Sequence, residues 1–140
     1  MLRPVFNVLS SLLFLAVVIQ VGLAGYATFD AIHKAKSGPV TQHTIEHGFD
    51  PHGLVGMVVL GVMVLLVLVA AAGKLGQTWL KWSVVLLVLG VIQMILGTAA
   101  KSAPALGFVH GINALAIYAG AALLAHRAWT REKHVPAPAA

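Results

Sequence analysis

The stretch LVGMVVLGVMVLLVLVAAA, residues 54–72, contains no charged or strongly polar side chain. About 20 such residues in one helix span the ~30 Å hydrocarbon core of a bilayer. Three further predominantly apolar runs cover residues 5–29, 80–99 and 106–125. None shows the polar–apolar alternation of barrel strands, and only helices and closed barrels satisfy their backbone in lipid. The sequence therefore predicts an all-α fold, an integral membrane four-helix bundle in contact with the lipid bilayer.

The composition supports this class and excludes several others. Only 9% of the residues are charged, whereas a soluble domain has about 25%. Cysteine is absent, which excludes disulfides, thiolate metal sites and thiol nucleophiles. The net charge is +5, but the basic residues are scattered at helix ends rather than gathered in a patch, so no nucleic-acid partner is predicted. Four acidic residues leave little for hydrolytic chemistry.

The chain is expected to form one transmembrane domain over residues 1–140. Residues 30–53 are predicted to form an outer loop, with a short surface helix near 41–47 and a turn at Asp50 and Pro51, and residues 130–140 a flexible tail. The first run could instead be a cleaved signal peptide, since Arg3 precedes it. Its apolar stretch is longer than the 7–15 residues of a signal core, which favours an uncleaved helix.

The distribution of basic residues predicts the orientation. Four crossings place both termini on one side of the membrane, and excess Lys and Arg mark the cytoplasmic face. The terminal side carries Arg3, Lys74, Lys81, Arg127, Arg131 and Lys133, and the other side carries Lys34, Lys36 and Lys101 together with Asp30, Glu46 and Asp50. We therefore expect a multi-pass protein of the bacterial inner membrane, a cell membrane, with both termini cytoplasmic.

A repeat is visible within the four runs. The first contains IQVGLAG at residues 19–25 and the third contains IQMILGT at residues 92–98. The second and fourth runs are entered through His52-Gly53 and His110-Gly111. The chain is therefore predicted to consist of two parallel-repeat helical hairpins. Such a duplication places His52 and His110 in equivalent positions at a similar depth.

A matched pair of histidines at the edge of the hydrocarbon indicates a ligand-binding role. A single histidine there could simply hydrogen-bond to a carbonyl, but polar side chains inside a membrane are costly. Two imidazoles on non-adjacent helices could bind one metal centre from opposite sides, as in bundles that hold cofactors. Haem suits this arrangement because its iron takes two axial histidines and its macrocycle prefers apolar walls. His52 and His110 are therefore the predicted axial ligands of a haem b.

Other residues are assigned supporting roles on the same hypothesis. Glycines beside the histidines would leave room for the ring plane; these are Gly56 and Gly111, with Gly53 and Gly107. The cations near that end could pair with the haem propionates; these are Lys34, Lys36 and Lys101. Asp50 or the region of His47 could orient His52.

Two further polar features have simpler interpretations. Gln20 and Gln93 are favoured as partners in interhelical hydrogen bonds, and Asn113 could join them. His43, His47 and His52 have a spacing compatible with a zinc or copper site, but they fall in a polar loop without cysteine, and a plain loop is favoured.

The segment QMILG at residues 93–97, followed by a histidine at the start of the next helix, resembles one half of the haem A synthase family. QVGLA at residues 20–24 matches it in part. That family is built from two similar four-helix bundles, each with a histidine pair on its second and fourth helices. The resemblance implies a bis-histidine haem pocket near the outer face with His52 and His110 as ligands. The chain has half the family's length and Gly53 where a basic residue often follows the histidine, so haem binding is implied more directly than hydroxylation of haem.

The leading functional hypothesis is a membrane b-type haem-binding protein that transfers electrons near the outer face, with a quinol or an external redox protein as partner. A cofactor-free accessory or structural membrane subunit is the first alternative. A haem-modifying enzyme related to haem A synthase, acting as a homodimer, is the second. The sequence leaves open whether the protein is an enzyme, and no catalytic residue is predicted.

Overall fold

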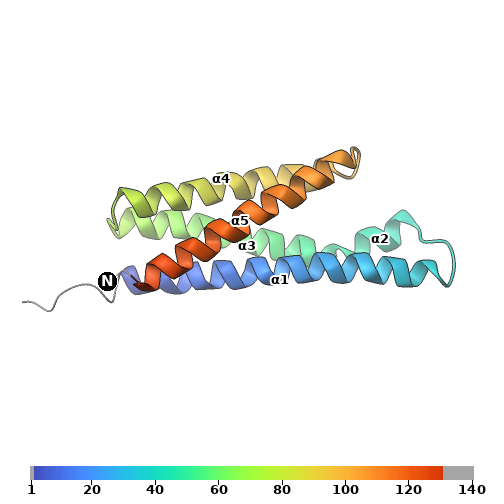
Figure 1. Ribbon diagram of the computed structural model, residues 1–140, viewed down its shortest axis with the longest axis horizontal. Coiled ribbons are helices and arrows are strands. Elements are labelled where there is room, and N and C mark those ends of the chain that lie inside the picture. The colour runs from blue at the N-terminus through green and yellow to red at the C-terminus, as the bar shows by residue number, and fades with distance from the viewer. Residues whose placement is uncertain (1, 131–140) are drawn as a thin grey trace, which may run out of the picture.

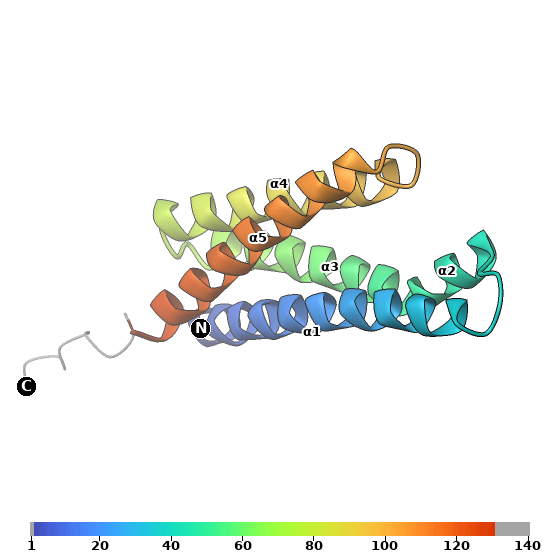
Figure 2. The same ribbon diagram turned by 45° about the vertical axis from the view of Figure 1, so that its right-hand side comes forward.

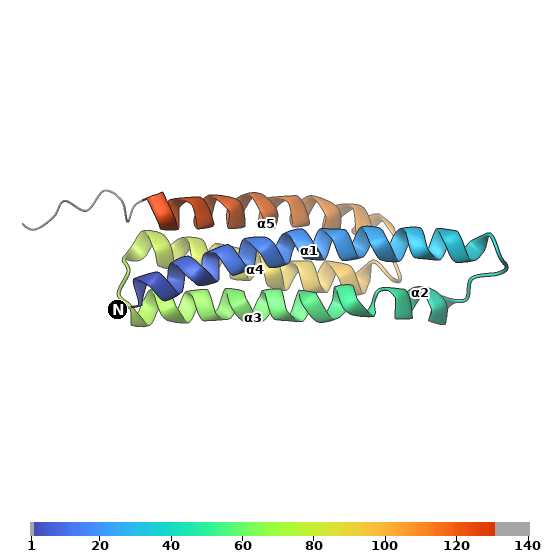
Figure 3. The ribbon, with the colours of Figure 1, turned by 90° about the horizontal axis from the view of Figure 1, so that it is seen from below.

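The computed structural model describes residues 2–130 and consists of helices joined by short connections (Figure 1). The elements are α1 (Arg3–Ala35), α2 (Gln42–Gly48), α3 (Asp50–Ala72), α4 (Gln77–Ala99) and α5 (Ala105–Thr130). α1, α3, α4 and α5 run side by side as a bundle, while the short α2 lies beside one end of α3 (Figure 3). The predicted all-α four-helix bundle is confirmed.

The four long helices have the length and apolar character needed to cross a membrane. Many of their large apolar side chains face outward, among them Leu65, Leu68, Ile95 and Leu115. A soluble monomer rarely exposes so much continuous apolar surface. The chain is therefore a multi-pass membrane protein whose outward-facing side chains contact lipid.

Several helices extend beyond the apolar runs that predicted them. α1 continues to Ala35, six residues past the expected end. The helix thus extends through polar residues that follow the apolar run. The predicted outer loop at 30–53 contains α2 and the start of α3. Asp50 and Pro51 were expected in a turn, but they begin α3. The first N–H groups of a helix have no partner within it, so a proline there costs no hydrogen bond, and a carboxylate interacts favourably with the helix dipole. α5 ends at Thr130, and the rest of the predicted tail lies outside the described residues.

The helices form a ring in which each packs against two neighbours. α1 contacts α3 and α5, and α4 contacts the same two helices. Within residues 2–130, the backbones of the diagonal pairs α1–α4 and α3–α5 do not come close to each other, and only side chains reach across, as Phe6 does to Trp79. The hairpin of α1 and α3 is thus related to the hairpin of α4 and α5 by an approximate two-fold axis along the bundle, with His52 and His110 on opposite corners.

The buried residues follow this two-fold relation. Ser10 and Ser83 are both buried and each donates to the carbonyl four residues earlier, that of Phe6 at 2.8 Å and that of Trp79 at 2.9 Å. Such back-bonding satisfies a hydroxyl inside a helix. The other buried residues also form pairs with a constant separation along the chain, one separation for α1 with α4 and another for α3 with α5. The α1–α4 pairs are Phe6 and Trp79, Leu13 and Leu86, and Val17 and Gly90; the α3–α5 pairs are Val59 and Ile117, Met63 and Ala121, Leu66 and Leu124, and Ala70 and Ala128. The core therefore agrees with the predicted repeat.

The core fills only one half of the bundle. We call the end where α1 starts and α5 finishes the terminal end, and the opposite end the histidine end. Buried side chains in α3 begin at Val59 and those in α5 at Ile117. In Figures 1 and 2 the two hairpins separate toward the histidine end. Side-chain packing therefore weakens in the half that contains His52 and His110.

Adjacent leucines in α3 provide a test of this core. Leu66 is fully buried, whereas Leu65 is 47% exposed in the lipid-facing direction. We expect Leu66→Ala to lower the free energy of unfolding by about 2–5 kcal/mol, because it leaves a cavity among packed side chains. Leu65→Ala should cost less than about 1 kcal/mol. Thermal unfolding in detergent, followed by far-UV circular dichroism, measures both; equal losses would contradict the described packing.

Candidate functional site

His52 and His110 face each other across the bundle axis. His52 lies in the first turn of α3 and His110 in the second turn of α5. Their ring centroids are 6.4 Å apart, with an angle of 57° between the ring planes. Both side chains are partly buried. The structure therefore brings together the two histidines that the repeat singled out.

Each ring is held by a backbone carbonyl of the neighbouring helix. Nδ1 of His52 lies 3.0 Å from the carbonyl oxygen of Gln20 on α1, and Nδ1 of His110 lies 3.1 Å from that of Gln93 on α4. Because a carbonyl can only accept, Nδ1 of each ring must carry the proton. Both Nε2 atoms then keep a lone pair, which is the state that a metal requires. The two contacts are equivalent under the two-fold relation.

The surroundings of the two Nε2 atoms differ. The side-chain amide of Gln93 donates to Nε2 of His110 at 3.0 Å. Asn113 fixes that amide by donating to Oε1 of Gln93 at 2.7 Å and to the carbonyl of Leu89 at 3.0 Å. Nε2 of His52 has no such donor among the described residues. A metal at His110 therefore requires the Gln93 side chain to rotate away first.

Gln20 occupies the position equivalent to Gln93 but makes different bonds. Its amide donates to the backbone carbonyl of His52 at 2.7 Å, and its Oε1 is buried without a hydrogen-bond partner. Val55 stands in the repeat where Asn113 stands, so no amide can reach Oε1 from that position. A buried acceptor without a donor is costly. This atom marks a place that a bound group could complete.

Two glycines make room for these side chains. A Cβ atom at Gly97 would lie 3.1 Å from Cε1 of His110, and one at Gly56 would lie 3.0 Å from Nε2 of Gln20. Gly111 has no atom within 4 Å of its Cβ position. Gly56 was predicted to border the ring plane, but it accommodates Gln20. Gly97 was not among the predicted site residues, although it lies one helical turn after Gln93 and thus on the same face.

The charged groups near the site pair mainly with one another. Lys34 contacts Asp30 at 2.6 Å, and Lys101 lies 3.6 Å from Glu46 of α2. The hydrogen bond from Gln42 and the charge of Lys101 lower the pKa of Glu46, so this carboxylate stays ionised to more acidic pH. Lys36 forms no ion pair with another described residue. Lys36 and the weakly paired Lys101 are thus the cations available to a ligand at this end.

The expected support for His52 from Asp50 or His47 is wrong. Oδ2 of Asp50 lies 2.7 Å from Nδ1 of His47, and both side chains are solvent-exposed. His52 turns to Gln20 instead and packs against the Phe49 ring edge, with centroids 6.0 Å apart. A backbone carbonyl of the neighbouring helix therefore holds the ring in place of the expected carboxylate.

The competing metal site in the loop does not form a three-ligand group. His43 and His47 stack with centroids 6.1 Å apart, while His52 points into the bundle. Among residues 2–130 no cluster of three histidine or carboxylate side chains is close enough to hold a metal ion. The described residues therefore leave His52 and His110 as the histidine pair that the structure brings together inside the bundle.

The spacing of the pair is compatible with one metal between the rings. With a metal–nitrogen bond of about 2 Å, two imidazoles on opposite sides of one ion have centroids about 6.3 Å apart, and two ligands of a tetrahedral ion about 5 Å apart. The observed 6.4 Å is close to the first value, while Nε2 of His110 contacts the Gln93 amide in this structure. A two-fold axis with one ligand on each side is also the symmetry of a planar macrocycle bound along both faces.

No family model, curated protein or solved structure matches the chain. The geometry of the site therefore carries the functional interpretation.

Proposed function

We propose that this protein binds one haem b between His52 and His110 and transfers electrons at the histidine end of the bundle. The observation that carries the proposal is the opposed pair of imidazoles, 6.4 Å apart, with both Nδ1 atoms bound to equivalent carbonyls. Each ring is thereby held in the tautomer whose Nε2 carries a lone pair, and that of His110 becomes available when the Gln93 amide rotates away. Haem iron with two axial histidines supplies a one-electron couple.

Three further features of the chain support a haem rather than a small ion. The histidine half of the bundle lacks the buried side chains that fill the terminal half, so the hairpins can separate around a flat group. Its partly buried apolar side chains, which suit a macrocycle, are Leu23, Val55, Met94, Leu96 and Leu106. Lys36 and Lys101 can face propionates at the end of the bundle.

Electron transfer is favoured over catalysis because two protein ligands leave no open coordination position for a substrate. The side chains around the pair are amides and aliphatic groups, which are poor general acids and bases. The terminal end carries Arg3, Lys74, Lys81 and Arg127, whereas the three carboxylates of residues 2–130 all lie at the histidine end. By the positive-inside rule, the site would face outward, where it can meet a quinol or an external redox partner.

The absorption spectrum of the purified protein tests this proposal. Protein isolated in detergent from haem-replete cells should show a Soret band and sharp bands on reduction, as expected for low-spin iron. Reduction and reoxidation should be reversible, and the reduced protein should not bind carbon monoxide readily, because both axial positions are occupied. Colourless protein from such cells would contradict the proposal and favour an accessory subunit.

Gly97 gives a second prediction at the site. In Gly97→Ala the new methyl group would press on the His110 ring at 3.1 Å and shift it from its carbonyl. We expect the affinity for haem to fall about fivefold, corresponding to about 1 kcal/mol. Gly22→Ala is the matched control, because its Cβ would meet no atom within 4 Å. Haem titration monitored at the Soret band measures both; an equal affinity in the two variants would argue against close packing of Gly97 on His110.

A further inference from the structure

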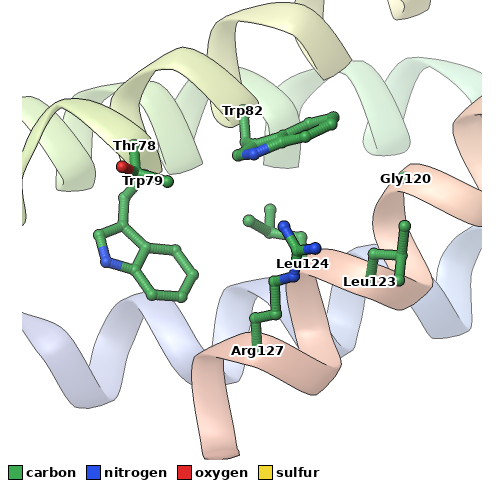
Figure 4. Close-up of a pocket in the computed structure, with 7 residues that line it drawn as sticks. All are labelled: Thr78, Trp79, Trp82, Gly120, Leu123, Leu124 and Arg127. Carbon is green, nitrogen blue, oxygen red and sulfur yellow. The ribbon is translucent and has the colours of Figure 1, made fainter. Parts of the chain in front are cut away.

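A groove at the terminal end lies between α4 and α5, far along the bundle from the histidines. It is lined by Thr78, Trp79, Trp82, Gly120, Leu123, Leu124 and Arg127. Trp79 and Leu124 are buried and form its floor, whereas Trp82 and Leu123 are 41% and 49% exposed and form its walls. Figure 4 shows the guanidinium of Arg127 extending from α5 toward the Trp82 indole on α4.

The polar side chains of this groove can all donate hydrogen bonds. Arg127 presents a guanidinium, Trp82 an indole N–H and Thr78 a hydroxyl. None of these three side chains hydrogen-bonds or forms an ion pair with another residue in the described range 2–130. Such a set is complementary to a ligand that presents acceptor oxygens.

The charges at this end favour an anion. Asp30, Glu46 and Asp50 are the carboxylates of the described chain, and each pairs at the histidine end with Lys34, Lys101 or His47. At the terminal end the guanidinium of Arg3 lies over the Trp79 ring, 4.0 Å from its centroid. Arg127 has no carboxylate partner among these residues.

The remaining lining of the groove is apolar and leads away from the charge. Leu123 and Gly120 continue the groove along α5 toward the middle of the bundle. A Cβ atom at Gly120 would lie 2.8 Å from Cδ2 of Leu86, so the glycine lets the two helices approach closely at this point. Thr78 lies in the first turn of α4 and Arg127 in the last turn of α5, the level at which tryptophan and arginine meet lipid headgroups.

We propose that this groove binds an anionic glycerophospholipid. The guanidinium of Arg127 and the N–H of Trp82 hold its phosphate, Thr78 donates to a second oxygen, and an acyl chain lies along Leu123 toward Gly120. The lipid would fasten α4 to α5 at the end of the bundle that also has the packed core. This inference is independent of haem binding, since no residue of the histidine site contributes to it.

Native mass spectrometry of the full chain in detergent tests the proposal. Phosphatidylglycerol or phosphatidylcholine with the same acyl chains is added, and we expect one phosphatidylglycerol to bind about fivefold more tightly than phosphatidylcholine. Arg127→Gln should lose about fivefold in phosphatidylglycerol affinity. Lys81→Gln, which removes an exposed cation of α4 outside the groove, should stay within about twofold of the unaltered protein.

Three results would overturn the proposal. These are equal losses in Arg127→Gln and Lys81→Gln, equal binding of the two lipids, and displacement of the lipid by inorganic phosphate at the same concentration, which would indicate a site for a free anion. Circular dichroism checks that each variant is helical. If Arg127→Gln fails to fold, Trp82→Leu on the exposed wall decides: it should lose affinity for phosphatidylglycerol by about threefold, and unchanged affinity would reject the site.

Discussion

His110→Ala is expected to abolish the low-spin haem spectrum of the purified protein, and His52→Ala to do the same. Each variant removes one of the two nitrogens that face each other across the axis. Changes to outer-shell partners typically cost 10–100-fold in metal affinity, and loss of a ligand should cost at least as much. Haem retained through purification should therefore fall by about tenfold or more, and the remainder should be five-coordinate and high-spin.

A nearby histidine and an added ligand control this result. His43→Ala should leave the spectrum unchanged, because His43 lies on exposed α2 and stacks on His47 rather than on the pair. Free imidazole added to His110→Ala should restore low-spin iron by occupying the vacated position. If both alanine variants kept the full spectrum of the unaltered protein, His52 and His110 would not be the ligands.

Gln93→Leu is expected to raise the affinity for haem about fivefold. In the described structure the Gln93 amide donates to Nε2 of His110 at 3.0 Å and is held there by Asn113. Iron must displace this hydrogen bond, whose net contribution is about 1 kcal/mol. Replacement with leucine removes the competing donor, keeps an apolar side chain of similar size and leaves the backbone carbonyl that orients the ring.

Gln20→Leu is the matched control supplied by the repeat. The Gln20 amide donates to the backbone of His52 and not to its Nε2. Removal of this amide therefore frees no ligand nitrogen and should not increase the affinity for haem. Haem titrations of the two variants compare the halves of the site directly. A gain of equal size in both, or a loss in Gln93→Leu, would show that the Gln93 amide does not compete with iron.

The repeat explains why the sequence predicted the histidine pair. His52 and His110 each follow a glutamine-containing helix by one connection. The spacing between them recurs in the buried pair Val59 and Ile117, and the spacing between Gln20 and Gln93 recurs in the buried pair Ser10 and Ser83. Gln20 and Gln93 were interpreted as interhelical hydrogen-bonding groups, and the structure confirms bonds from both to the neighbouring helix. The two-fold repeat in the sequence therefore predicts that these residues lie near one axis of the bundle.

Other features could not be predicted because they have no side-chain signature. The carbonyls of Gln20 and Gln93 that hold the rings belong to the backbone. Every residue has such a carbonyl, so the residue types do not predict this contact. The extension of α1 to Ala35 was missed because hydropathy marks the apolar run and not the helix, which continues through polar residues. The difference between Asn113 and Val55 is visible in the sequence, but its effect on Gln93 depends on helix packing.

The most direct test of the central claim is pulsed electron paramagnetic resonance of the ferric protein with ¹⁵N-labelled histidine. The account predicts low-spin iron coupled to two axial histidine nitrogens of one chain, with one of them lost in His52→Ala and the other in His110→Ala. Iron coupled to one histidine nitrogen or to none, in protein that retains a stoichiometric haem, would contradict it.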